Sequence, residues 1–141
     1  MTLNLRPDSN TFLNELLITA KYKDGGRGPL FYDCWGLTRY ARSELYNLPL
    51  LPSYGHISAD DKRKLTKACA EVIRSHVFEW CDPWPSAIAT VWQGGACTHI
   101  ALVIEREGQL AVLEINKGSG IRIVALDEFQ RLYSDVRFYN D

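Results

Sequence analysis

Cys34 is the residue in this sequence best placed to do chemistry, because it stands at the predicted start of a helix. A thiolate at a helix N-terminus is stabilised by the helix dipole and by backbone N–H groups that have no partner. The same N–H groups point toward any oxygen held beside the sulfur, so one helical turn offers both a nucleophile and oxyanion donors. Asp33 is placed to cap this helix. The structural alternative is that Cys34 is a small core residue.

The residues before and after Cys34 form a longer motif. Tyr22, the pair Gly25-Gly26 and the run Asp-Cys-Trp-Gly-Leu at 33–37 occur in this order. This segment resembles the catalytic segment of the NlpC/P60 cysteine peptidases, and the tryptophan after the cysteine is similar to the phage and prophage tail-associated branch. The resemblance covers residues 22–54 well and residues 12–126 loosely. It implies a papain-like α+β fold and cleavage of an amide bond in the peptide stems of bacterial peptidoglycan.

A cysteine nucleophile needs a base, and the resemblance assigns this role to His99. The family carries a histidine at the start of the second core strand, which corresponds here to the run His-Ile-Ala-Leu-Val at 99–103. Strand alternation places His99, Ala101 and Val103 on one face, where the small residues are expected to let the helix bearing Cys34 approach closely. The structural alternative is a neutral histidine at the edge of the core.

The third member of the triad orients the imidazole, and in this family it is usually His, Asn or Gln on the following strand. The run Lys-Gly-Ser-Gly at 117–120 resembles the Glu-Gly-Ser-Gly that trails this position in tail-associated relatives, which carries the role onto Glu114. A carboxylate holds an imidazole N–H as well as an amide does and favours the imidazolium form. The family implies Glu114 as the first choice and Asn116 as the alternative.

Strand geometry offers a check on the third residue. If the loop between the two strands has an even length, His99 pairs with Asn116, and Glu114 lies on the same face one diagonal step away. An odd loop instead places Leu113 and Ile115 on that face. The structural alternative for Glu114 and Asn116 is that both are solvated residues of an exposed sheet face.

Three further side chains are candidates for substrate or oxyanion contacts. The resemblance gives Asp33 a second role, as a carboxylate that receives the free amino group of the substrate. It also places Tyr22 over the nucleophile, where the hydroxyl assists the oxyanion, although Tyr22 also fits a half-buried aromatic residue at a helix end. Trp35 is expected to line the cleft. We expect no metal or organic cofactor, because Cys97 and His99 are only two ligands on one face.

The elements that must position these residues follow from hydrophobic period, which changes from helical in the first half to alternating in the second. This pattern predicts an α+β domain, with N-terminal helices packed on one face of a central antiparallel sheet. The predicted helices span residues 9–20, 34–47 and 61–80, the strands span 88–92, 99–105, 110–116 and 121–124, and a short closing helix spans 126–133.

Composition limits the classes of partner. The chain has 141 residues, 16 Lys and Arg against 17 Asp and Glu, and a net charge of −1, which predicts a single domain over residues 1–141. Without a basic excess we expect no nucleic-acid partner and no membrane partner. The four cysteines have neither zinc-site nor disulfide-scaffold spacing and are expected to be thiols.

The first residues lack the unbroken apolar run of a secretory signal, and no window reaches the ~18 apolar residues of a membrane span. We therefore expect synthesis in a bacterial cytoplasm, with the virion tail as the location that the resemblance implies. The expected partners are a peptidoglycan stem peptide and phage tail proteins. Two alternatives remain open: a non-catalytic tail component, which the atypical third residue favours, and an amidase or transamidating effector with another amide substrate.

Overall fold

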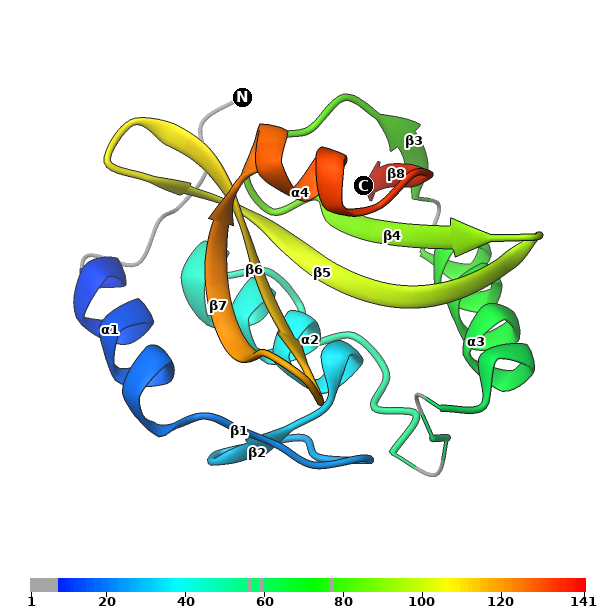
Figure 1. Cartoon of the computed structure of the whole chain (residues 1–141), viewed down its shortest axis with the longest axis horizontal. Helices are drawn as coiled ribbons and strands as arrows, with labels where there is room; N and C mark the ends of the chain where they lie inside the picture. Colours follow the sequence, from blue (N-terminus) through cyan, green and yellow to red (C-terminus); the bar gives the residue numbers. More distant parts are fainter. Residues whose placement is uncertain (1–7, 56, 59, 77) are drawn as a thin grey trace.

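The chain is described by a computed structural model over residues 8–55, 57–58, 60–76 and 78–141. Three of the four helices precede the sheet strands in the chain (Figure 1), as the change in hydrophobic period predicts, although two short strands lie between the first two helices and a short helix precedes the last strand. The helices are α1 (Ser9–Thr19), α2 (Cys34–Tyr46), α3 (Lys62–Ser75) and α4 (Leu126–Leu132). The strands are β1 (Lys21–Tyr22), β2 (Phe31–Tyr32), β3 (Glu79–Cys81), β4 (Ile88–Gln93), β5 (Ala96–Arg106), β6 (Gln109–Asn116), β7 (Gly120–Ala125) and β8 (Val136–Asn140).

A six-stranded antiparallel sheet in the order β3-β8-β4-β5-β6-β7 forms the centre of the α+β fold. Helices α1, α2 and α3 lie on one face of this sheet, and the short helix α4 lies on the other (Figure 1). The central strand β5 is therefore buried on both faces and is apolar at successive positions, as two-sided burial requires. No helix in the described part of the chain is long and apolar enough to cross a bilayer.

The two faces of β5 contact different helices. Leu102 and Ile104 belong to the core that packs on α1 and α2. Ala101 and Val103 instead belong to the core around Phe129 of α4. The prediction that these small residues admit the helix bearing Cys34 is therefore wrong, because α2 packs on the opposite face and the space above the small residues is filled from α4.

The turn between β5 and β6 has an even length, which is one of the two cases that the sequence left open. Arg106 pairs with Gln109, and the antiparallel pairing runs from there to Leu102–Leu113. Beyond that pair the two strands diverge (Figure 1): β5 continues alongside β4, and β6 continues alongside β7. The parity is that of the even case, which puts Glu114 on the same face as His99, but the pairing ends before it reaches His99. Past this point Cys34 of α2, His99 of β5 and Asn116 of β6 line a common cleft.

The third helix is shorter than predicted. It ends at Ser75, and Glu79–Cys81 forms the edge strand β3, which pairs with β8 at the end of the chain. The Trp80 ring contacts Tyr139 of β8, with ring centroids 6.2 Å apart. Neither β3 nor β8 has a clear sequence signal, because each is short and is stabilised by a partner that is distant in the sequence.

Two glycines set how closely the loop after β1 approaches the start of α2. A Cβ atom on Gly36 would lie 2.0 Å from the carbonyl oxygen of Gly26, and a Cβ atom on Gly26 would lie 2.6 Å from the backbone of Phe31. The Asp33 N–H donates to the same Gly26 oxygen at 3.3 Å. The glycines of the motif around Cys34 thus have a steric role, which is to let two backbone segments touch.

We expect Gly36→Ala to lower the free energy of unfolding by at least about 2 kcal/mol, because the clash outweighs the better helix propensity of alanine. Gly118→Ala is the matched control, since a Cβ atom there meets only a side-chain oxygen of Asn116 at 3.7 Å. Urea unfolding of both variants measures the difference. Equal stabilities for the two variants would contradict the close approach of the loop to α2.

Candidate active site

A cleft of about 260 Å³ opens at the N-terminus of α2, between the diverging strands β5 and β6. It contains the two residues that the sequence predicts to react, Cys34 and His99. Other lining residues are Tyr22, Asp60, Asn116 and Lys117. Lys117 forms an ion pair with Asp60, so the rim of the cleft is bridged by opposite charges.

Helix α2 presents Cys34 at its first residue, as predicted. The Asp33 side chain accepts a hydrogen bond from the Gly36 N–H at 2.8 Å, and the Asp33 carbonyl accepts from the Leu37 N–H at 3.0 Å. The predicted cap is confirmed. With the N–H groups of Gly36 and Leu37 engaged, the backbone N–H of Cys34 is the first-turn donor nearest to its own thiol.

His99 lies between Cys34 and Glu114. Its Nε2 atom is 2.8 Å from Oε1 of Glu114, and its ring also interacts with the Cys34 thiol, which raises the pKa of the imidazole. Because Glu114 engages Nε2, the nitrogen left for the thiol is Nδ1. The structure therefore brings the predicted nucleophile, base and orienting carboxylate into one hydrogen-bonded row.

The electrostatics of this row favour an imidazolium. Burial alone lowers the pKa of His99, but hydrogen bonds to Cys34 and Glu114, together with their charges, raise it to about 9. Burial raises the pKa of Glu114, but hydrogen bonds and the charge of His99 outweigh that effect and lower it. At neutral pH the pair is therefore an imidazolium beside a carboxylate.

Asn116, the alternative orienting residue, lies at the cleft but is engaged elsewhere. Its Oδ1 atom accepts hydrogen bonds from the Gly118 N–H at 3.1 Å, and from the N–H and hydroxyl of Ser119 at 2.8 and 2.9 Å. The side chain therefore closes the turn between β6 and β7. Among the two candidates, Glu114 is the one whose side chain contacts His99.

Two residues around Glu114 were not anticipated from the sequence. The Nε atom of Arg122 donates to Oε2 of Glu114 at 2.7 Å, and the Tyr133 hydroxyl donates to Oε1 at 3.0 Å. Arg122 is directly opposite Glu114 in the β6–β7 pairing. The register of that hairpin could therefore have identified it as a neighbour of Glu114. Tyr133 follows α4, and no local pattern brings it to the site.

Tyr22 lines the cleft near the nucleophile. Burial, followed by the negative charges of Cys34, Asp24, Asp33 and Asp60, raises its pKa to about 12. The phenol therefore keeps its proton at neutral pH and can donate a hydrogen bond to an oxygen held in the cleft. This placement agrees with the expected oxyanion contact, which stays a prediction.

Asp33 does not have the open position that the resemblance implies. It is 1% exposed, Oδ1 is 2.6 Å from Nη1 of Arg27, and Oδ2 accepts from the Gly25 N–H at 3.1 Å. Arg27 also donates to the backbone carbonyls of Ser53 and Tyr54. The carboxylate therefore holds the loops around α2 together, and the structure offers it no free face for a substrate amino group.

Trp35 does not line the cleft either. It is 6% exposed, and its indole N–H donates to the carbonyl of Pro52 at 3.0 Å. Successive residues of a helix point about 100° apart, so a side chain next to Cys34 in sequence faces the core when the thiol faces the cleft. The expectation for Trp35 ignored this rotation.

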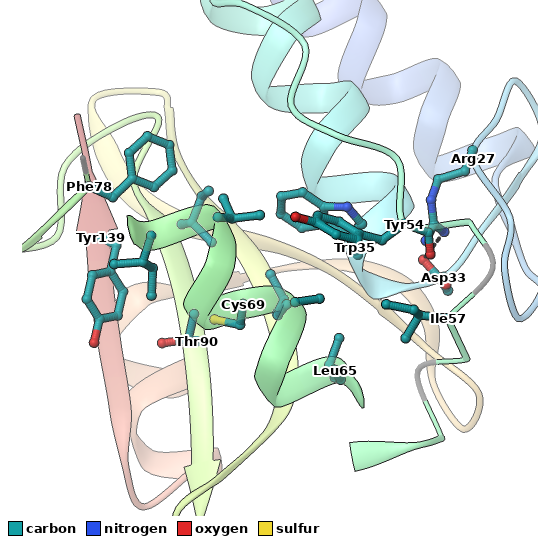
Figure 2. Close-up of a pocket in the computed structure, with 15 residues that line it drawn as sticks. Arg27, Asp33, Trp35, Tyr54, Ile57, Leu65, Cys69, Phe78, Thr90 and Tyr139 are labelled. Carbon is teal, nitrogen blue, oxygen red and sulfur yellow. Dashed lines mark hydrogen bonds and ion pairs between the residues drawn. The ribbon is translucent and has the colours of Figure 1, made fainter. Parts of the chain in front are cut away.

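An apolar pocket lies between α3 and the sheet, and Figure 2 shows Arg27, Asp33 and Trp35 at one side of it and Phe78 and Tyr139 at the other. Its volume is about 30 Å³, which has room for water but not for a peptide. The cleft at Cys34 is therefore the candidate site.

The described residues contain no group of three or more His, Cys, Asp or Glu side chains arranged to hold a metal ion. All four cysteines are thiols, as predicted. No model of a known protein family matches the chain, and no curated protein matches it at a significant level.

We expect the His99 ring to titrate with a pKa of about 9, and Glu114→Gln to lower that pKa because the supporting negative charge is lost. Asn116→Ala is the control and should leave the pKa unchanged. NMR of ¹³C-labelled histidine measures all three proteins. A wild-type pKa near the unperturbed value of about 6.5 would contradict the hydrogen-bonded row.

The raised pKa of His99 also makes the free energy of unfolding depend on pH. Because the pKa of His99 is raised in the folded state, its contribution is fully present below about pH 6.5 and is lost as the pH rises through about 9.

Proposed function

We propose that this protein is a cysteine peptidase that hydrolyses an amide bond in the peptide stem of bacterial peptidoglycan, after a γ-D-glutamyl residue. The observation that carries the proposal is the row of Cys34, His99 and Glu114 at an open cleft. A thiol at a helix N-terminus with a charged imidazole beside it is the arrangement that activates a cysteine nucleophile. The choice of substrate rests on the resemblance of residues 22–37 to the NlpC/P60 family.

The arrangement of elements supports a papain-like fold of the NlpC/P60 type. A helix carries the nucleophile at its first residue, and the antiparallel sheet on which it packs carries the base and its orienting partner on adjacent strands. A non-catalytic tail component has no need for these three groups to be hydrogen-bonded at an open cleft. The association with a phage or prophage tail rests on the motif alone.

The proposed reaction begins with attack of the Cys34 thiolate on the carbonyl carbon of the scissile amide. The electron pair moves onto the carbonyl oxygen, toward which the Cys34 N–H and the Tyr22 hydroxyl are placed to donate. The His99 imidazolium then gives its proton to the departing amine, which leaves a thioester on Cys34. His99 next takes a proton from water, and the resulting attack releases the acid and restores the thiolate. Glu114 stabilises the imidazolium at each stage.

Purified protein is expected to release free amines from peptidoglycan stem peptides, and Cys34→Ala and His99→Ala should each abolish that release without unfolding the chain. Cys81→Ala and His76→Ala are the matched controls, since both residues lie outside the cleft, and they should keep activity. Quantifying new amino groups on defined muropeptides measures the effect. Activity that survives Cys34→Ala would rule out the mechanism, and a folded wild type inert on every stem peptide would favour the non-catalytic alternative.

The role of Glu114 is tested by comparing alanine variants of the two orienting candidates. We expect Glu114→Ala to lower kcat/KM by roughly tenfold to a thousandfold, which is about 1.4 to 4 kcal/mol of transition-state stabilisation. Glu114→Gln should lose less, because it keeps an acceptor for the His99 N–H but not the charge. Asn116→Ala should change kcat/KM by no more than about threefold, because it removes only a turn contact. A damaging Asn116→Ala with a silent Glu114→Ala would reverse the assignment.

A further inference from the structure

Glu114 is the most enclosed acidic group of the site and has donors on both carboxylate oxygens. It is 1% exposed, although it lies only one residue from the cleft-lining Ile115. Its donors come from three separate elements: His99 from β5, Arg122 from β7 and Tyr133 from the end of α4. Burying a carboxylate costs free energy unless hydrogen-bond donors satisfy its oxygens. Here donors from three elements do so, and the question is what this arrangement does for the site.

Arg122 holds the oxygen that His99 does not use. Its Nε atom is 2.7 Å from Oε2, and the register of β6 with β7 places the two residues directly opposite each other. Without Arg122, the carboxylate would be tethered through Oε1 alone and free to rotate about that contact. The guanidinium also completes an alternating row of charges, since a thiolate, an imidazolium, a carboxylate and a guanidinium together sum to zero.

Tyr133 restrains both the carboxylate and the imidazole. Its hydroxyl donates to Oε1 at 3.0 Å, and its ring packs on the His99 ring with centroids 5.6 Å apart. Phe129 supports the Tyr133 ring from behind, at 4.8 Å between centroids. Tyr133, at the end of α4, therefore limits rotation of the His99 ring by packing against it.

We propose that Arg122 and Tyr133 are positioning residues for His99, which act through Glu114 by fixing both of its oxygens against the imidazole. This inference rests on the proposed function, because the orientation of His99 matters only if it exchanges protons with Cys34. Neither residue lines the cleft, so a bound substrate does not touch them in this structure. Their removal should therefore lower kcat and leave KM unchanged.

The charged and titratable groups around this row are few. Glu114 is faced by His99, Arg122 and Tyr133, and His99 is faced in addition by Cys34. The remaining titratable groups that line the cleft are Tyr22, Asp60, Lys62 and Lys117. None of the proposed variants alters those four groups, so a change in titration reports on the row itself.

The test uses Arg122→Gln, Arg122→Lys and Tyr133→Phe in the full chain. Arg131→Gln and Tyr139→Phe are the matched controls, because Arg131 is exposed on α4 and pairs with Asp127, and Tyr139 lies on β8. The first readout is the carboxyl titration of Glu114 by ¹³C NMR, assigned with Glu114→Gln. Loss of a donor or of the positive charge favours the protonated form, so the pKa of Glu114 should rise in Arg122→Gln and Tyr133→Phe. Arg122→Lys should restore it in part.

The second readout is the rate at which iodoacetamide alkylates Cys34 at neutral pH, followed by mass spectrometry. We expect roughly a threefold to thirtyfold slower reaction in Arg122→Gln and Tyr133→Phe, and a similar loss in kcat, with both controls close to wild type. Unchanged titration and alkylation in both variants would overturn the positioning role.

The two readouts separate this inference from the proposed function. If the wild type does not cleave stem peptides but the variants shift the Glu114 titration and slow alkylation, the positioning role stands and the substrate assignment fails. If the wild type cleaves stem peptides and the variants match it in kcat and pH profile, the proposed function stands and the positioning role fails.

Discussion

The hydrogen bond between Glu114 and His99 joins two strands at the place where they separate. Up to Leu102 and Leu113 the backbone pairs β5 with β6, and past that point a contact between side chains spans the gap. The cleft lined by Cys34 and His99 lies where the two strands have separated. A carboxylate suits this position because each oxygen accepts more than one donor, so a single side chain holds β5, β7 and α4 together.

The opposite wall of the cleft depends on a second buried carboxylate. Asp33 caps α2 and binds Arg27, which in turn donates to the backbone at Ser53 and Tyr54. The close contact of Gly26 with Gly36 brings this loop against the helix. Cys34 is therefore placed by one network and His99 by another, and the cleft lies where the two networks meet. Such independent supports restrict Cys34 and His99 to one relative geometry, which the proposed catalysis would require.

Charge alternation gives the site its chemical character. Each group in the proposed row of thiolate, imidazolium, carboxylate and guanidinium stabilises the charged form of its neighbour. Burial alone would favour the neutral forms of His99 and Glu114, and the partners reverse that effect for both. A carboxylate, where the family that residues 22–37 resemble usually has an amide or imidazole, therefore strengthens the charge on His99, and Arg122 offsets the cost of burying that carboxylate.

Local information in the sequence was sufficient for several of the elements and for part of the site. Hydrophobic period located α1, α2 and the strands β4 to β7, and the capping preference of Asp33 located the start of α2. The resemblance pointed to Glu114, and the sequence reduced the strand parity to two cases, of which the structure shows the even one. These features depend on residues within one helix or one hairpin, where spacing along the chain determines spacing in three dimensions.

Tertiary packing decided the rest: which face of β5 meets α2, the rotation of Trp35 into the core, the enclosure of Asp33 by Arg27, and the approach of Tyr133 to Glu114. Each of these depends on contacts between elements distant in the sequence, and neither periodicity nor turn length encodes such contacts.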